Sequence, residues 1–315
     1  MRVSNENIPI IKNASDKAIT NNAFTHKKGN NITSGISCRD PFILLYNGEY
    51  YLYKSTWKDI VVLKSNDLIS FSDEKVVFSA TKDFYGIDNM FWAPECHYYN
   101  GKFYIFTSCL SRETNKRRIT ILVSDTPDGP FIEHTVGGIS PKDWHSIDGT
   151  LYIEDDIPYM IFVHEWVDME DKNGSFVYAR LSSDLKEMVD LPKTMFYAKE
   201  LKDGHGVTDG CYPVKLSDGT LMLIWSNYVF DSEYVIAKAV SDNGKLNGKW
   251  IQKGLLYKKG IKKEFSRDGG HGMVFLDKNN EYKLCFHSPN SPIDNICSKV
   301  NLATVVEKDG DLIIK

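Results

Sequence analysis

A unit of short aromatic strand segments joined by a tight turn recurs five times along this chain. The turns fall near residues 48, 101, 157, 219 and 279, a spacing of roughly 55–60 residues with about four strands per unit. Asn47-Gly48, Asn100-Gly101 and Asp218-Gly219 are typical of two-residue hairpins between strands. Four-stranded antiparallel units repeated in this way are typical of a propeller. The sequence therefore predicts an all-β fold, a five-bladed β-propeller over residues 36–315, after an N-terminal arm or cover strand over residues 1–35.

The first strand of each unit is the one expected to line the central channel. We predict these strands at Phe42–Tyr46, Ala93–Tyr99, Gly149–Ile153, Tyr212–Leu216 and Met273–Leu276. Two stacked β-sandwich domains would also use many strands. A sandwich, however, gives no reason for a Ser-Asp type of turn to recur at one phase of the early units.

Composition excludes several classes of function. A net charge of −4 and a pI near 6.1 give no basic field for nucleic acid or an anionic membrane. No apolar run approaches the roughly 18 residues of a membrane-spanning helix. The first thirty residues contain no apolar stretch of secretory type, which predicts a cytoplasmic protein if Met1 is the natural start, or a secreted one if a signal was removed. Six widely spaced cysteines predict buried free thiols.

Polar residues stand in front of each predicted inner strand. They are Asp40, Trp92 with Glu95, Asp148, Asp209 and His271. An Asp before a turn is often a simple turn cap, but three Asp residues at matching phase in separate units are better explained by convergence on one axis. Converging carboxylates cannot all ionise freely, so at least one pKa is expected to rise. One acid and one base of this kind can cleave a glycosidic bond, and Trp92, Trp144, Trp166 and Trp225 could supply faces for sugar stacking.

Four motifs in this order resemble glycoside hydrolase family 43, the inverting arabinosidases and xylosidases on a five-bladed propeller. They are Arg39-Asp40-Pro41-Phe42, Trp92-Ala93-Pro94-Glu95, Ser146-Ile147-Asp148-Gly149-Thr150 and Gly270-His271-Gly272. Each motif alone is weak, but together they span roughly residues 36–290 and are specific. The resemblance implies a glycosidase whose partner is an oligosaccharide containing arabinose or xylose.

The resemblance also implies roles for individual residues. Asp40 becomes the general base that deprotonates water, and Asp148 the carboxylate that tunes and orients the acid. The chain departs from the family pattern at the acid itself, because Asp209 stands where a Glu is usual. Its shorter side chain is expected to widen the gap to Asp40. Glu95 and Glu165 therefore stay open as alternative proton donors.

Further contacts are expected around these three acids. We predict that substrate is bound by Arg39, Trp92, Glu95, His145, Glu165 and Trp166. By resemblance, His271 lies on the propeller axis and could hold a calcium ion. Because calcium prefers oxygen ligands, water molecules would complete its coordination shell. A channel histidine that is hydrogen-bonded without metal is the alternative.

Other functions on the same architecture also fit in part. A retaining fructosidase would carry Arg-Asp-Pro in a middle blade, not the first, and a mannoside phosphorylase would need a phosphate-binding cluster that the sequence lacks. A non-catalytic carbohydrate-binding propeller and a β-galactosidase-type member of the family remain as alternatives.

Overall fold

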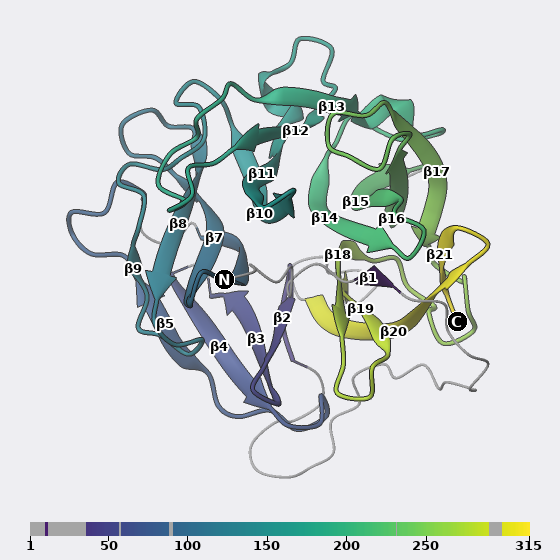
Figure 1. Cartoon of the computed structure of the whole chain (residues 1–315), viewed down its shortest axis with the longest axis horizontal. Coiled ribbons are helices and arrows are strands. Elements are labelled where there is room, and N and C mark those ends of the chain that lie inside the picture. Colours follow the sequence, from purple (N-terminus) through teal and green to yellow (C-terminus); the bar gives the residue numbers. More distant parts are fainter. Residues whose placement is uncertain (1–9, 12–35, 57, 88–90, 231, 290–297) are drawn as a thin grey trace.

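The computed structural model describes residues 10–11, 36–56, 58–87, 91–230, 232–289 and 298–315. Its strands form five sheets arranged around a central axis (Figure 1), which confirms the all-β, five-bladed propeller. Within each blade the strands follow one another in sequence order and pair antiparallel. The first strand is innermost, so every blade is a simple meander that runs outward from the axis.

The five blades have the following strands. Blade one contains β2 (Phe42–Tyr46), β3 (Glu49–Ser55), β4 (Asp59–Ser65) and β5 (Lys75–Ser79), and blade two contains β6 (Trp92–Tyr99), β7 (Lys102–Leu110), β8 (Arg117–Ser124) and β9 (Ile132–Glu133). Blade three contains β10 (Ser146–Glu154), β11 (Ile157–His164), β12 (Ser175–Arg180) and β13 (Lys193–Tyr197). Blade four contains β14 (Asp209–Leu216), β15 (Leu221–Val229), β16 (Glu233–Ser241) and β17 (Trp250–Tyr257), and blade five contains β18 (Gly270–Leu276), β19 (Tyr282–Pro289), β20 (Ser298–Lys308) and β21 (Asp311–Ile314).

The hairpin turns lie close to the predicted positions. Asn47 and Gly48 both have positive φ (48° and 74°), as do Asn100 and Gly101 (46° and 83°), which is the backbone of the two-residue turns that suit twisted strands. In blade three the turn lies at Asp155-Asp156, slightly before the predicted place. Strand β13 has no counterpart in our sequence prediction, because most of its residues are exposed or half-buried and show no clean alternation.

Two short helical turns and one extra strand complete the described elements. The helical turns η1 (Trp166–Asp168) and η2 (Ala198–Glu200) are single 3₁₀ turns, and no helix among the described residues is long and apolar enough to cross a membrane. Strand β1 (Ile10–Ile11) pairs parallel with the inner strand β14, at Lys215 and Leu216. Apart from β1, the predicted N-terminal arm lies outside the described residues.

The core fills the spaces between neighbouring blades with aromatic and aliphatic side chains. Trp225 is 0% exposed and contacts Phe176 and Phe196, with ring centroids 5.2 and 5.5 Å away. The expectation that Trp225 offers a face for sugar stacking is therefore wrong, since its ring packs between blades three and four. The five described cysteines are buried free thiols, as predicted.

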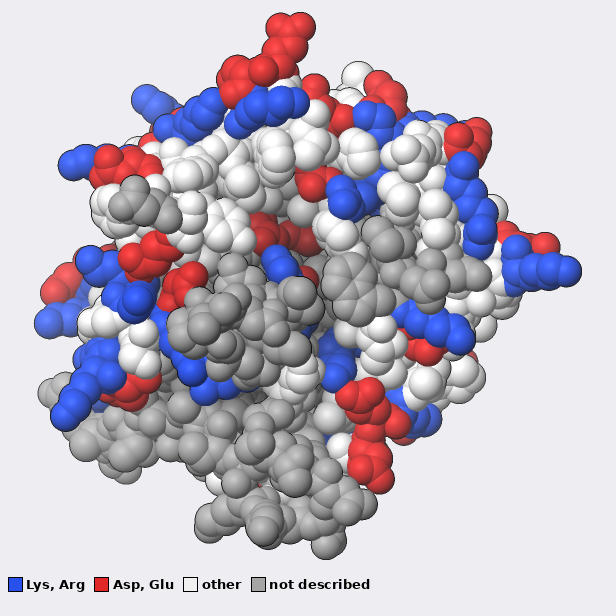
Figure 2. Space-filling model, turned by 180° about the vertical axis from the view of Figure 1, so that it is seen from behind, with Lys and Arg blue, Asp and Glu red and all other residues white. Residues whose placement is uncertain are grey.

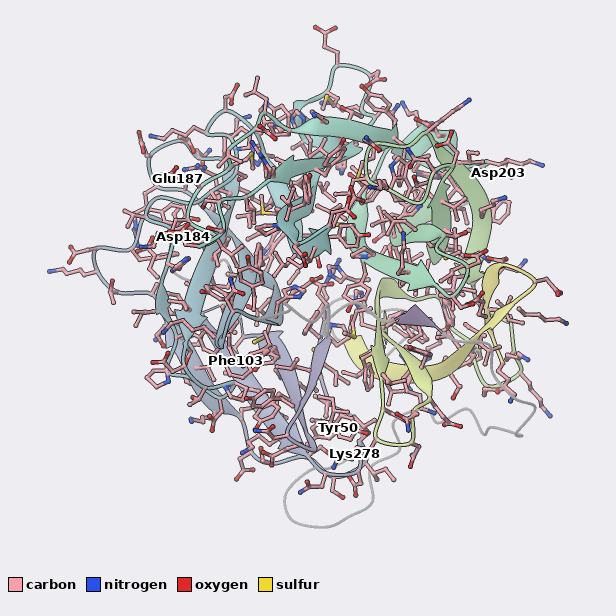
Figure 3. All side chains as sticks on the ribbon, viewed as in Figure 1. Tyr50, Phe103, Asp184, Glu187, Asp203 and Lys278 are labelled. Atoms are coloured by element: carbon pink, nitrogen blue, oxygen red, sulfur yellow. The ribbon has the colours of Figure 1, made fainter. Side chains whose placement is uncertain are left out.

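The ring closes between blade five and blade one without a shared strand among the described elements. Cys38 N–H donates to Ser298 C=O at 2.9 Å, just ahead of blade one. On the rim, the Lys278 N–H donates to the Tyr50 hydroxyl at 2.9 Å, and the Lys278 ammonium lies 5.0 Å from the Tyr50 ring centroid (Figure 3). Side-chain and backbone contacts therefore hold the first and last blades together.

We expect Tyr50→Phe to lower the free energy of unfolding by about 1 kcal/mol, because the Lys278 N–H loses its acceptor at the closure. Urea denaturation measures this change. Tyr46→Phe is the matched control, because no described residue bonds to the Tyr46 hydroxyl. Equal effects of the two substitutions would show that this contact adds nothing to ring closure.

Candidate active site

One residue at the head of each inner strand has a left-handed backbone. These residues are Asp40 (φ 52°), Ala93 (44°), Asp148 (53°), Gly210 (46°) and His271 (51°). In blades two to five they lie in irregularities of the strand register. The conformation costs roughly 1–2 kcal/mol for a residue with a Cβ. It turns the side chains of Asp40, Asp148 and His271 to a common point.

Gly210, not Asp209, occupies this place in blade four. Our alignment of Asp209 with Asp148 was therefore off by one residue. Asp209 stands one position earlier, where its partner on the second strand is Ser226. It reaches the axis from a different backbone position than the other two acids.

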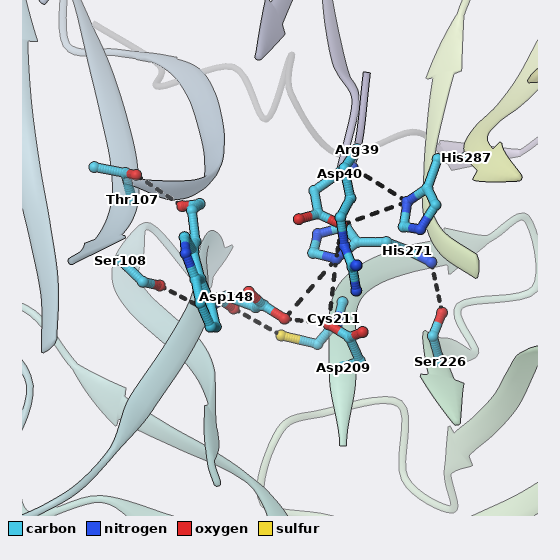
Figure 4. Close-up of polar contacts among 12 residues, drawn as sticks. Arg39, Asp40, Thr107, Ser108, Asp148, Asp209, Cys211, Ser226, His271 and His287 are labelled. Carbon is cyan, nitrogen blue, oxygen red and sulfur yellow. Dashed lines mark hydrogen bonds and ion pairs between the residues drawn. The ribbon is translucent and has the colours of Figure 1, made fainter. Parts of the chain in front are cut away.

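Backbone N–H groups of these residues are held by the preceding blade (Figure 4). Asp148 N–H donates to Ser108 Oγ at 3.1 Å, and His271 N–H donates to Ser226 Oγ at 2.7 Å. Asp40 N–H donates to His287 Nδ1 at 3.1 Å. The same kind of contact is therefore also present across the ring closure, between blades five and one. Each acceptor lies on the second strand of its blade, so neighbouring blades fix the direction of the axial side chains.

The His271 imidazole lies among all three predicted catalytic acids. Its Nδ1 is 3.1 Å from Asp40 Oδ1, 3.4 Å from Asp209 Oδ1 and 3.9 Å from Asp148 Oδ2. The convergence expected from the sequence is therefore present. Figure 2 shows acidic side chains next to a basic one in a hollow near the middle of one face, with scattered charges of both signs around it.

Mutual attraction sets the charges of Asp40 and His271. Burial lowers the pKa of His271, but the charges of Asp40 and Asp148 outweigh it and raise that pKa well above its usual value. Burial likewise opposes ionisation of Asp40, but His271, His287 and Arg39 outweigh it and lower the pKa of Asp40. Burial lowers the pKa of His287 to about 4, so its Nδ1 is free to accept the Asp40 N–H.

The other two acids behave as a pair. Burial, with repulsion from Asp209 and Asp40, raises the pKa of Asp148 well above its usual value against the attraction of His271. Burial also acts on Asp209, but His271 and hydrogen bonds from Asp148 and Tyr234 lower its pKa. The Tyr234 hydroxyl donates to Asp209 Oδ2 at 2.5 Å. One carboxyl is thus protonated beside an ionised one, as expected of converging acids.

The distance between Asp40 and Asp209 is bounded by their contacts with His271. Their Oδ1 atoms lie 3.1 and 3.4 Å from the same nitrogen of His271, so these two atoms are at most about 6.5 Å apart, the lower limit for an inverting pair. The expectation that the shorter side chain of Asp209 widens this gap relative to a Glu stays a prediction.

A second polar group lies beside the axis, between blades two and three. Arg117, at the start of β8, places its guanidinium carbon 3.9 Å from the centre of the Trp92 ring and its Nη1 3.1 Å from Glu165 Oε2. The Arg117 N–H donates to His145 Nδ1 at 3.1 Å. Burial lowers the pKa of His145, so this nitrogen is an unprotonated acceptor. Three predicted substrate contacts, Trp92, His145 and Glu165, are therefore brought together by Arg117.

Asp168 fixes the loop that carries His145. Its Oδ2 accepts the His145 N–H at 2.5 Å and its Oδ1 accepts a hydrogen bond from Lys116 Nζ at 2.6 Å.

Trp144 stacks on His164 with ring centroids 3.8 Å apart and an interplanar angle of 4°. Trp166 is half-buried in η1, next to this loop.

The remaining predicted contacts lie in two different environments. Arg39 is half-exposed at the mouth, with its Nε 3.8 Å from Asp40 Oδ1. Glu95 is buried and bonded to His97 at 3.2 Å, and its charge acts on Cys211 and Tyr212 further along β14.

Sequence reasoning missed Arg117, Tyr234 and His287. A usable signal existed for His287, because it pairs with Gly270 just as Ser108 pairs with Trp92 and Ser226 with Asp209. Polar residues at one register position of the second strands mark the acceptors of the next blade. Arg117 and Tyr234 lie on the third strands of blades two and four, whose patterns look like ordinary packing.

The chain matches the model of the protein family described as glycosyl hydrolases family 43 over residues 30–310. A xylosidase/arabinosidase from Humicola insolens is 27% identical over 43% of this chain and 46% of its own length. An extracellular endo-α-(1→5)-L-arabinanase from Bacillus subtilis is 24% identical over 61% of this chain and 45% of its own length. The chain thus spans about half the length of these curated relatives.

Solved structures resemble this chain over nearly its whole length. An endo-arabinase from Bacteroides thetaiotaomicron is 35% identical with a TM-score of 0.78, covering 88% of this chain and 96% of that one. An endo-1,4-β-xylanase from the same organism is 27% identical with a TM-score of 0.74, covering 89% and 95%. A thermostable family-43 glycoside hydrolase, 22% identical with a TM-score of 0.79 over 92% and 96%, shares the fold.

We expect Gly210→Ala to displace His271 and to lower any activity of the site at least tenfold. A Cβ at residue 210 would lie 2.7 Å from His271 Cγ and 2.8 Å from its Cα. Gly101→Ala is the control, because Gly101 also has a positive φ but a Cβ there meets nothing within 4 Å. Kinetics and thermal unfolding of both variants separate the contact from the backbone strain. Equal losses in the two would contradict a special role for the approach of Gly210 to His271.

Proposed function

This chain belongs to glycosyl hydrolase family 43, and we propose that it hydrolyses arabinose- or xylose-containing oligosaccharides with inversion at the anomeric carbon. It is a glycosidase by family. The observation that carries the proposal is the set of three axial carboxylates around His271. The names of its relatives, an arabinosidase, arabinanases and a xylanase, support this substrate class.

Asp40 is the residue we propose as general base. It is ionised because its pKa is lowered by His271, His287 and Arg39 against the effect of burial. Its side chain is 17% exposed, so a water molecule can reach it from the hollow. The guanidinium of Arg39 stands at the mouth beside it and can donate hydrogen bonds to sugar hydroxyls.

The predicted role of Asp148 remains a proposal, and the general acid stays open among Asp209, Glu95 and Glu165. Asp148 is 3% exposed and bonded to Asp209, which suits a carboxyl that tunes a neighbour. The cytoplasmic location also remains a prediction, as does the choice between arabinose and xylose. A panel of nitrophenyl arabinofuranosides, xylosides and galactosides tests the substrate class. Release of nitrophenol from none of them, with sugar still bound, would favour the carbohydrate-binding alternative.

The predicted calcium ion is also carried forward as a proposal. Asp148, Asp209 and His271 offer three ligand atoms within 4.8 Å of one another. Asp40 Oδ1 and His271 Nδ1 are buried and, among the described residues, make no hydrogen bond of good geometry. This donor set fits a cation whose remaining ligands are water. Bound there, the ion would neutralise the carboxylates, and it would exclude a proton from His271 Nδ1.

We expect Asp40→Asn to reduce turnover at least 100-fold while leaving the fold intact, because water loses its base. Steady-state kinetics on the best substrate of the panel measures the loss, and circular dichroism checks the fold. Retention of more than about a tenth of the wild-type rate would remove Asp40 from the role of general base.

If calcium binds at His271, millimolar calcium should raise the unfolding temperature and a chelator should lower it, because a ligand specific to the folded state stabilises that state. Thermal unfolding after dialysis against each measures this. His271→Ala should abolish the calcium response. An unchanged unfolding temperature in both conditions would leave the imidazolium as the only cation at the centre.

A further inference from the structure

The carboxylate on the blade-four side is poorly placed to protonate a leaving group. Asp209 accepts the Tyr234 hydroxyl at 2.5 Å and lies 3.4 Å from His271 Nδ1, and both contacts favour its ionised form. It is also at most about 6.5 Å from Asp40, which leaves little space for a water molecule and a sugar between them. Both oxygens of Asp209 are thus engaged by protein groups, and the carboxylate lies close to the base.

The Asp148 carboxyl is buried and bonded within the protein. Its side chain is 3% exposed. Its Oδ2 accepts the Gly210 N–H at 2.8 Å, and its carboxyl is bonded to Asp209. A substrate oxygen would have to displace both partners to reach it.

Glu165 is differently placed. It directly follows His164, the last residue of β11, which pairs with Ser146 two residues before Asp148. This puts it at the site-facing end of blade three. Asp209 exerts a repulsion on Glu165, so the two carboxyls are near enough to interact.

Only one oxygen of Glu165 is occupied by the protein. Its Oε2 lies 3.1 Å from Arg117 Nη1 and 3.8 Å from His145 Nδ1. No described residue bonds to Oε1, and this atom is not among the buried oxygens that lack a partner. Arg117 is itself fixed on the Trp92 ring. The carboxyl is thus held by one oxygen, while Oε1 is left without a bond from any described residue, in a side chain that is 8% exposed.

We propose that Glu165 is the general acid of this enzyme, a proposal that rests on the glycosidase function above. Glu165 Oε1 gives its proton to the glycosidic oxygen as the bond from that oxygen to the anomeric carbon breaks. The oxygen of a water molecule forms the new bond at the opposite face, and Asp40 takes the proton that this water releases. Glu165 is reprotonated from solvent and Asp40 returns its proton to solvent, so atoms and charge balance.

The state of Glu165 agrees with this role. Burial raises the pKa of its carboxyl, Arg117 opposes that effect, and repulsion from Asp209 adds to it. A raised pKa keeps the carboxyl protonated to a higher pH than an ordinary glutamate. The active form is the protonated one, so the rate should fall as pH rises through this pKa.

Aryl glycosides with leaving groups from dinitrophenol to phenol test the proposal, since a good leaving group needs little protonation. We expect Glu165→Gln to lose at least 100-fold in kcat/KM on the phenyl glycoside and less than tenfold on the dinitrophenyl one. It should also lose the alkaline limb of the pH profile. Asp209→Asn should lower kcat/KM by a similar factor on both substrates. Glu95→Gln is the control for removing a buried glutamate, and circular dichroism checks each fold.

The outcomes separate this proposal from the proposed function. Equal loss of Glu165→Gln on all leaving groups, or selective loss in Asp209→Asn or Glu95→Gln, would overturn the assignment of Glu165 and leave the glycosidase intact. A wild-type enzyme that cleaves neither aryl glycosides nor arabinose- or xylose-containing oligosaccharides would overturn the proposed function itself.

Discussion

The attraction between one imidazole and three carboxylates is the interaction on which this site depends. His271 Nδ1 lies within 3.9 Å of Asp40, Asp148 and Asp209. Three buried acids would repel one another strongly without a positive partner. The imidazolium, or a cation in its place, allows Asp40 and Asp209 to ionise while Asp148 keeps a proton. The site therefore contains an ionised base whose repulsion from the neighbouring carboxylates is offset by a positive charge.

The propeller brings these groups together by repeating one local backbone arrangement in each blade. A left-handed residue heads each inner strand, and in four blades its N–H is held by a side chain of the preceding blade. The strain of the left-handed backbone is thus offset by contacts between blades. This links stability to function, because the contacts that join the blades also aim Asp40, Asp148 and His271 at the axis.

The fold and the axial residues could be predicted because they repeat. Hairpin dipeptides and Asp residues at one phase are visible in the sequence, so the propeller and the meeting of Asp40, Asp148, Asp209 and His271 followed from them. The backbone register of Asp209 was not visible, because only the structure shows that Gly210 takes the left-handed place. Arg117 and Tyr234 act through contacts between strands distant in sequence, which no repeat reveals. Trp225 was misread because a tryptophan in a strand gives no sign of which side it faces.

The position of the acid decides the stereochemistry, and that outcome can be observed. If Asp40 works with Glu165 as the acid, a water molecule attacks the face opposite the leaving group and the configuration inverts. If Asp40 works with Asp209, at most about 6.5 Å away, the pair approaches the spacing of retaining enzymes, roughly 5–5.5 Å. Proton NMR of the sugar during the first minutes of hydrolysis identifies the anomer released. The account predicts the inverted anomer, and a first product that retains the configuration of the substrate would contradict it.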